Sequence, residues 1–417
     1  MTSLSSLSKK YIDEINHYGA HNYHPLDVVI SHGRGEWLWD IDGNKYLDML
    51  SAYSALSHGH CHPKIQKKLV EQSSRVTLAS RAFYNDQFGL WLKKLTDFCK
   101  MEMALPMNTG AEAVETAIKI ARKWGYVKKN IPKDKAEMIV CDHNFHGRTT
   151  TIVGFSSEPQ YRDLFGPHSG GFVSVKYGDI SSLKNAITEN TVGFLFEPIQ
   201  GEAGIIVPPE GYLKDIYEIC KKNNILCIAD EIQTGLGRTG KLFACMYENI
   251  QPDLMILGKA LGGGFYPISA VVGSKEIMEI LQPGDHGSTF GGNSLACAVS
   301  QTALDVLIEE NLSDRAFNLG EKFRKELSTL SKKVVKEVRG KGLLNAIEIH
   351  PTAGEGHFYT ELLMKNGILA KETHNTTIRF APPLVIEESS LNFAIQIILD
   401  VFSKTQSEHQ KLDKKID

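Results

Sequence analysis

The sequence of 417 residues predicts an α/β fold, with a large domain whose mostly parallel sheet is flanked by helices and a smaller α+β domain. Two observations predict this fold class. From about residue 64 onward, segments with helical periodicity alternate with short apolar runs, which is typical of βαβ units. After about residue 310 the helical segments become strongly charged and the alternation changes, which indicates a second unit. A chain of this length can bury two cores.

The predicted elements follow in order along the chain. Residues 36–50 form a hairpin, because an Asp-Gly turn separates two apolar runs. The large domain has short apolar runs, typical of buried strands, at 104–107, 137–141, 172–175, 192–196, 225–229, 254–257 and 269–273. Helical periodicity covers 64–75, 111–129, 212–223 and 294–309. The small domain is predicted to contain helix 312–330, strand 342–350, helix 356–366, strand 376–380 and helix 388–403.

These elements suggest four regions. Residues 1–60 are expected to form an N-terminal segment that packs with the small domain, and residues 61–309 to form the large domain. Residues 310–403 complete the small domain, which is therefore built from both chain ends. Residues 404–417 are polar and charged, and we expect them to fray.

The composition argues against several classes of function. The net charge of -3 lacks the basic excess that nucleic acids and anionic membrane surfaces require, so neither partner is predicted. No apolar stretch approaches the length of a membrane span. The seven cysteines are odd in number and lie mostly in apolar runs, which is typical of reduced, buried thiols. Residues 1–10 lack an apolar core and an arginine, so we expect a cytoplasmic protein; a trimmed organellar precursor would have the same features.

Two reactive side chains stand where predicted strands end. Asp230 follows the run 225–229, and Lys259 follows the run 254–257. Because the carboxyl ends of parallel strands form one crevice, the acid and the lysine should meet there. Desolvation would lower the pKa of the lysine and supply the neutral amine that a carbonyl needs; the alternative is a solvated loop lysine. These are the two side chains that an enzyme needs at least to use pyridoxal phosphate (PLP): a lysine to bond its aldehyde and an acid to pair with its pyridinium nitrogen.

A candidate phosphate site follows the first predicted strand of the large domain. Residues 108–113 lead from strand 104–107 into a strongly helical run. Gly110 at the helix start exposes backbone N–H groups, and the helix dipole favours an anion there. Ordinary capping of the helix by Thr109 is the alternative, and the two interpretations are compatible.

Three further side chains are candidates for binding rings or carboxylates. Phe145 could cover one face of a cofactor ring, and Arg148 offers a bidentate fork for a carboxylate, although a core phenylalanine and a surface arginine are the simpler alternatives. Arg379 lies among apolar residues, so it needs an acidic partner or an anionic ligand. Glu197 and Glu202 are the candidate partners.

Two other motifs are interpreted as structural. Residues 235–240 match a GxGxxG pattern, but they neither follow their strand directly nor open an evident helix, as a dinucleotide site requires. Residues 58–63 contain three histidines and a cysteine, but no second group of ligands has a matching spacing, and the glycine and proline favour a tight turn. No metal site is predicted.

The motifs named above resemble the class III, or ω-aminotransferase, group of fold-type I PLP enzymes over nearly the whole chain, from residue 18 to the Arg379 segment. Residues 230–235 and 258–261 match the group as a whole. The segments that resemble the branch acting on ornithine are 21–25, 80–85, 339–346 and 379–383.

The resemblance implies how the cofactor would be held. Lys259 would bond PLP and shuttle a proton, Asp230 would pair with the pyridinium nitrogen, and Gln233 would contact the ring oxygen. The residues implied to touch the ring or the phosphate from the same subunit are Phe145, Gly110 and Ala111. Ser288 and Thr289 would contact the phosphate across a subunit interface, so the resemblance implies a homodimer with shared active sites.

The resemblance also implies small amino-acid and keto-acid substrates. Arg148 would bind the distal carboxylate of either substrate, and Arg379 the α-carboxylate of glutamate or 2-oxoglutarate. Glu202 would mask Arg379 when ornithine, which must present its δ-amine, enters. Tyr23 and Tyr53 match positions that orient ornithine.

One position departs from the ornithine branch. His146 stands where that branch carries tryptophan, and histidine there is commoner in relatives that act on acetylornithine. The implied reaction is transfer of the δ-amino group of ornithine to 2-oxoglutarate, with acetylornithine or 4-aminobutyrate as alternative amino donors. A mutase or decarboxylase on the same fold, an NAD enzyme and a binding protein without catalysis are more distant alternatives.

Overall fold

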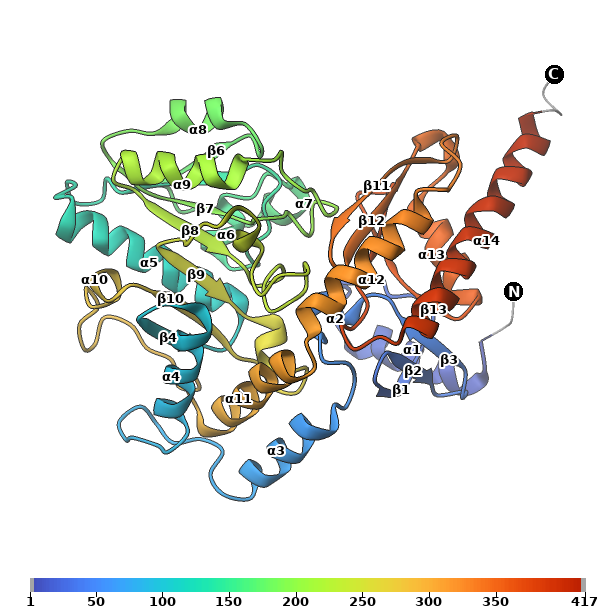
Figure 1. Cartoon of the computed structure of the whole chain (residues 1–417), viewed down its shortest axis with the longest axis horizontal. Helices are drawn as coiled ribbons and strands as arrows, with labels where there is room; N and C mark the ends of the chain where they lie inside the picture. The colour runs from blue at the N-terminus through green and yellow to red at the C-terminus, as the bar shows by residue number, and fades with distance from the viewer. Residues whose placement is uncertain (1–3, 414–417) are drawn as a thin grey trace.

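The computed structural model describes residues 4–413, with side chains described as far as residue 403. The large domain is built on a sheet with the strand order β4-β10-β9-β8-β7-β5-β6 (Figure 1). Its strands are β4 (Met103–Met107), β5 (Glu137–Cys141), β6 (Phe172–Val175), β7 (Thr191–Phe196), β8 (Leu226–Asp230), β9 (Leu254–Leu257) and β10 (Ser269–Gly273). Strands β5 to β9 pair in parallel, whereas β10 runs antiparallel to both β9 and β4. The predicted α/β class with a mostly parallel sheet is confirmed.

Helices cover both faces of this sheet. Successive residues of a strand point to opposite faces. On β5, Met138 packs into the core beneath α5 (Gly110–Lys128), whereas its neighbour Ile139 packs into the core beneath α9 (Tyr212–Lys222). Other helices of the large domain are α3 (Pro63–Ser73), α4 (Phe88–Cys99), α6 (Thr150–Gly154), α7 (Pro159–Arg162), α8 (Ile180–Ala186), α10 (Lys275–Met278) and α11 (Ser294–Glu309).

One edge of the sheet gathers the segments that carry the candidate site. Strand β8 ends at Asp230, and β9 is followed by Gly258 and Lys259. Because β10 is antiparallel to both of its neighbours, β4 points the same way as β9, and it leads into α5 at this edge. Strand β7 leads at the same edge into Glu197.

The smaller domain contains an antiparallel sheet with the order β11-β12-β15-β14. Its elements are α12 (Leu312–Leu327), β11 (Val335–Lys341), β12 (Leu344–Ile349), α13 (Gly356–Lys365), β13 (Ile368–Leu369), β14 (Lys371–Thr373), β15 (Thr377–Phe380) and α14 (Glu388–Asp413). Arg379 is a buried residue of β15, where it pairs with Ala346 of β12 on one side and Lys371 of β14 on the other.

The N-terminal segment joins this smaller domain. Strands β1 (Ile30–Arg34), β2 (Trp37–Asp40) and β3 (Lys45–Asp48) form an antiparallel sheet to which the C-terminal strand β13 adds in parallel. The two ends of the chain therefore share one sheet, and Figure 1 shows β1 to β3 beside β13.

Several element bounds differ from the prediction. The predicted strand 342–350 is the second half of a hairpin whose first strand, β11, was not predicted. Helix α14 extends to Asp413 rather than ending at residue 403, because residues 404–413 contain neither glycine nor proline. Residues 414–417 of the predicted frayed tail lie outside the described residues. Helix α1 (Ser6–Tyr18) was also not predicted. At the start of this helix, Ser5 and Ser8 donate hydrogen bonds to the carboxylate of Asp42, which is distant in the sequence.

Candidate active site

A cavity of about 200 Å³ opens at the carboxyl ends of the strands. It brings together residues that the sequence predicted from separate segments: Gly110, Ala111, Phe145, Glu202, Asp230, Gln233 and Lys259. The cavity is also lined by residues that were not predicted to belong to the site: His146, Gly147, Ile199, Ile232 and Thr234. Asp230 and Lys259 therefore do share one crevice.

Lys259 occupies a strained backbone position at the edge of the sheet. Its φ of 43° is in the left-handed region, which costs energy for a residue with a side chain. A short 3-10 turn (Lys259–Gly262) and Gly263, at φ 60°, complete the tight turn. Burial lowers the pKa of the Lys259 amine, and Glu202 and Asp230 only partly oppose this shift. The site thus favours the neutral amine that reacts with a carbonyl.

Asp230 is held by two donors. The Asp230 Oδ1 atom accepts a hydrogen bond from the Ile232 N–H at 3.0 Å, and Oδ2 lies 2.6 Å from His146 Nδ1. Both side chains are buried. Burial acts to lower the pKa of His146, but the hydrogen bond and the charge of Asp230 outweigh it, so this pKa is raised. Sequence reasoning noted His146 only as a departure; its place beside Phe145, in the loop after β5, was the available signal.

Glu197 holds the loop that carries Phe145. The Glu197 carboxylate accepts the Phe145 N–H at 3.0 Å and the Gly201 N–H at 3.3 Å. Burial raises the pKa of Glu197 to about 7, while His146 opposes the shift and Asp230 adds to it. Of the two acids considered as partners of Arg379, Glu197 was therefore the wrong one, because its carboxylate is engaged by backbone donors of the large domain.

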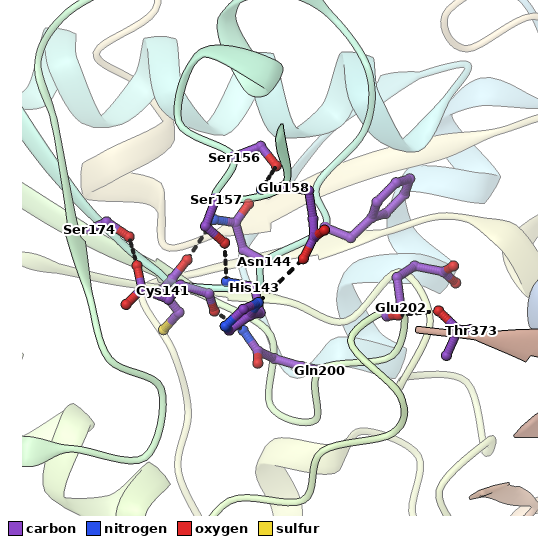
Figure 2. A network of polar contacts seen from close by, with 12 residues as sticks. Cys141, His143, Asn144, Ser156, Ser157, Glu158, Ser174, Gln200, Glu202 and Thr373 are labelled. Carbon is purple, nitrogen blue, oxygen red and sulfur yellow. Dashed lines mark hydrogen bonds and ion pairs between the residues drawn. The ribbon is translucent and has the colours of Figure 1, made fainter. Parts of the chain in front are cut away.

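Further polar contacts hold the same loop in place, as Figure 2 shows. Asn144 Nδ2 donates to the Cys141 carbonyl at 2.6 Å, and Gln200 Nε2 donates to the Asp142 carbonyl at 2.7 Å. Thr373 of the smaller domain donates its hydroxyl to the Glu202 carbonyl at 3.1 Å. The loops after β5 and β7 are thus tied to each other, and the loop after β7 is also tied to the smaller domain.

The N-terminus of α5 presents its first turn to the cavity. Thr109 and Glu112 form a capping box, in which the Glu112 N–H donates to Thr109 Oγ1 at 3.2 Å and the Thr109 N–H donates to Glu112 Oε2 at 2.8 Å. Gly110 leaves little room for a side chain, since an added Cβ would lie 3.0 Å from Ile232 Cδ1 and that side chain would have to shift slightly. The capping box uses the N–H groups of Thr109 and Glu112. The N–H groups of Gly110 and Ala111 take no part in it, and both residues line the cavity, where the helix dipole favours a phosphate.

Arg379, which does not itself line the cavity, forms an ion pair with Glu202, which does. Their Nη1 and Oε1 atoms are 2.7 Å apart, and Arg379 is buried. Burial acts to raise the pKa of Glu202, but the charges of Arg379 and Lys259 outweigh it and the pKa is lowered. Gln233 Nε2 donates to the same Glu202 oxygen and to the Tyr53 carbonyl, both at 3.3 Å.

Tyr53 belongs to a strained segment. Residues 51–54 all have positive φ, although none is glycine. Asp48 accepts hydrogen bonds from the backbone N–H groups of Leu50 and Ser51 at the start of this left-handed turn. The turn brings the Tyr53 ring to 5.3 Å from the Arg379 guanidinium. Strain of this kind persists where the surroundings enforce it, and it concentrates at functional sites.

Other predicted site residues are not part of the cavity wall. Arg148 is exposed and lies 3.6 Å above the Tyr161 ring. The Tyr23 side chain is 75% exposed. Ser288 accepts a hydrogen bond from Asn108 of its own chain at 2.9 Å, and neither Ser288 nor Thr289 is among the residues that line the cavity.

The two motifs interpreted as structural lie in packed regions. Within residues 235–240, Arg238 is fully buried and donates to the Leu343 and Pro382 carbonyls at 3.0 and 2.6 Å. His58, His60 and His62 each bond a different partner: the Ala303 carbonyl, Asp48 and Glu310. Among the described residues, these histidines therefore do not form a group that could hold a metal ion. None of the helices in the described part of the chain is long and apolar enough to cross a membrane.

A lysine with a desolvated amine, a buried acid and a helix N-terminus around one cavity fit a cofactor with an aldehyde, a protonated ring nitrogen and a phosphate. The chain belongs to the class-III aminotransferase family, which it matches over residues 18–402. It is 56% identical to an ornithine aminotransferase of Geobacillus over 93% of this chain and 96% of that protein.

Solved structures show the same likeness. The ornithine aminotransferase of Toxoplasma gondii, which holds PLP at partial occupancy in its active site, has a TM-score of 0.95 and 45% identity, covering 97% of this chain and 96% of that one. An acetylornithine aminotransferase of Elizabethkingia anophelis has a TM-score of 0.87 and 48% identity, covering 95% of this chain and 99% of that one.

Proposed function

We propose that this chain is a PLP-dependent enzyme that transfers the δ-amino group of L-ornithine to 2-oxoglutarate. The products are glutamate and glutamate 5-semialdehyde, which cyclises to pyrroline-5-carboxylate. The observation that carries the proposal is the ion pair between Arg379 and Glu202, since Glu202 lines the same cavity as Lys259. The similarity to ornithine aminotransferases over nearly the whole chain supports the same substrate.

PLP, when bound, supplies an aldehyde that captures an amine and a ring that withdraws electrons from the carbon next to it. Lys259 is the residue to bond that aldehyde, and its lowered pKa keeps the amine ready. Asp230 would hold the ring nitrogen, Gln233 would contact the ring oxygen and Phe145 would cover one ring face. The N–H groups of Gly110 and Ala111 at the start of α5 would bind the phosphate.

The two substrates differ in charge, and the ion pair can serve both. Ornithine presents an amine with no carboxylate beside it, so Glu202 keeps Arg379 neutralised while ornithine is bound. Glutamate and 2-oxoglutarate carry a carboxylate there, which competes with Glu202 for the guanidinium of Arg379. Arg148 would take the distal carboxylate of either substrate. Tyr53 and Tyr23 would orient the ornithine chain.

We further propose a cytoplasmic homodimer in which Ser288 and Thr289 of the partner subunit complete the phosphate site. Supporting this, a second hollow of about 400 Å³ adjoins Lys259 and Gly110 on the side of Tyr266. Tyr84 and Phe290 are exposed aromatic residues, and Phe83 is a third. Aromatic side chains are enriched at protein–protein interfaces, and these three would contribute to one here.

Relative rates on three amines test the substrate. We expect kcat/KM for ornithine to exceed those for acetylornithine and 4-aminobutyrate by roughly tenfold or more, with 2-oxoglutarate required for turnover. A preference for acetylornithine would favour the alternative that the Elizabethkingia relative and His146 suggest. Turnover of ornithine without any keto acid would contradict a transferase and favour a mutase or decarboxylase.

A further inference from the structure

His146 is a buried titratable group that the proposed reaction does not use. Its Nδ1 atom lies 2.6 Å from Asp230 Oδ2, and the whole residue is buried. Its Nε2 atom is also buried and makes no hydrogen bond to any residue that the structure describes. One ring nitrogen is therefore committed to the acid that would face the cofactor, and the other has no partner among the described residues that would hold a proton on it.

We propose that His146 carries a proton against Asp230 in the cofactor-free protein and releases it when the pyridinium nitrogen of PLP reaches the same carboxylate. This inference rests on the proposed use of PLP and adds a linked proton to its binding. His146 is a positioning residue, since it would act on the cofactor only through Asp230.

The charges around the imidazole determine the direction. Asp230 at the end of β8 and Glu197 after β7 both favour a protonated ring, while burial opposes it. Burial lowers the pKa of Lys259, after β9, although the charges of Glu202, Asp230 and Glu197 favour its ammonium form. Two buried carboxylates therefore share the available positive charges. A pyridinium cation beside Asp230 adds another positive charge, which favours loss of a proton from a neighbour.

The hydrogen bonding determines which proton leaves. The Nδ1 proton is held by Asp230, whereas a proton on Nε2 would be buried without an acceptor, which costs free energy. Loss of the Nε2 proton to the solvent leaves the Nδ1–H bond intact. Asp230 then keeps both its orientation and its full negative charge opposite the ring nitrogen, which the reaction needs.

Proton release on cofactor binding tests this inference. PLP would be titrated into the cofactor-free protein in a calorimeter, in two buffers with different ionisation enthalpies, so that the protons released per site are counted. His146→Asn is the main variant, because its amide can replace the Nδ1 donor but does not titrate. His143→Gln is the matched control: His143 lies in the same loop, is exposed and pairs with Glu158.

Wild type and His143→Gln should release the same number of protons, and His146→Asn should release fewer, by up to roughly one per site. Because wild type would release an extra proton, its binding of PLP should become tighter as the pH rises. The PLP dissociation constant of wild type, divided by that of His146→Asn, should therefore fall by up to about tenfold per pH unit through the titration of His146. Equal proton release by wild type and His146→Asn would overturn the inference and leave His146 a purely structural donor.

Two further results distinguish a failure of this inference from a failure of the proposed function or of the variant to fold. Absence of PLP binding by the wild-type protein would contradict the proposed function itself. If His146→Asn does not fold, NMR of the wild-type protein with 15N-labelled histidine gives the answer directly. One imidazole should change from doubly to singly protonated when PLP is added near neutral pH. If no imidazole changes in this way, the inference is overturned.

Discussion

The Oε1 atom of Glu202 lies 2.7 Å from Nη1 of Arg379, so an acid after β7 of the large domain neutralises a buried cation on β15 of the smaller domain. Gln233 Nε2 donates to the same Glu202 oxygen from a third segment. The charge of the cavity wall therefore depends on one contact between the two domains. A ligand carboxylate and Glu202 would compete for the same guanidinium.

Replacing Glu202 by alanine tests this competition. The unmasked Arg379 should favour substrates with a carboxylate beside the reacting amine, so we expect kcat/KM for ornithine to fall by roughly tenfold or more while the rate with glutamate is kept or rises. Glu218→Ala, an exposed substitution on α9, is the control. Equal changes with both donors in Glu202→Ala would show that the ion pair does not set the choice of donor.

The left-handed turn at Tyr53 predicts opposite effects of glycine at two neighbouring alanines. Ala52 has φ 47° and ψ 52°, so Ala52→Gly should stabilise the protein by up to about 1 kcal/mol through relief of strain. Ala55 has φ -77° and ψ -25°, where glycine gives no relief and costs about 0.5–1 kcal/mol. Denaturant unfolding measures both free energies, and destabilisation of equal size by the two substitutions would contradict a strained turn at Ala52.

Arg238 connects the two domains through buried hydrogen bonds. Its guanidinium donates to the Leu343 and Pro382 carbonyls and to Ser57 Oγ. Arg238→Met would leave these acceptors buried without their donor, and we expect a loss of about 2–5 kcal/mol in the free energy of unfolding. Arg75→Met, at an exposed ion pair with Asp86, should change stability by less than about 0.5 kcal/mol. Similar losses for both variants would contradict the role given to Arg238.

Glu197 predicts a specific dependence of stability on pH. Burial raises its pKa from 4.5 to about 7, so the folded protein binds the proton more tightly than the unfolded chain does. Its contribution to stability is complete below pH 4.5 and is lost as the pH rises through about 7. Relative to Glu197→Gln, wild type should lose roughly 1–3 kcal/mol over this range in denaturant titrations. Parallel pH profiles for the two proteins would refute the shift.

Local sequence signals predicted the parts of the site that follow directly from strands. The apolar runs of β8 and β9 placed Asp230 and Lys259 at one edge, and the start of α5 was evident from Thr109 and Gly110. Contacts between distant segments were beyond such signals. The bond between His146 and Asp230 joins residues 84 positions apart, and the choice of Glu202 over Glu197 depends on how the two domains meet.

The backbone strain could not be predicted from the sequence either. The turn at residues 51–54 contains no glycine that would announce positive φ, and it exists because Asp48 and the surrounding chain hold it. Arg238 lies inside a GxGxxG pattern, and nothing in that pattern indicates that its side chain is buried. Both features depend on tertiary contacts, which propensity and periodicity do not encode.

The most direct test of the central claim is the absorbance spectrum of the purified protein with PLP, before and after ornithine is added without any keto acid. We predict a visible band from cofactor bonded to Lys259, its loss on addition of ornithine, and its return when 2-oxoglutarate follows. Lys259→Ala should lack this band. A protein that forms no such band even with excess PLP would contradict the account, and a band unaffected by ornithine would contradict the assigned amino donor.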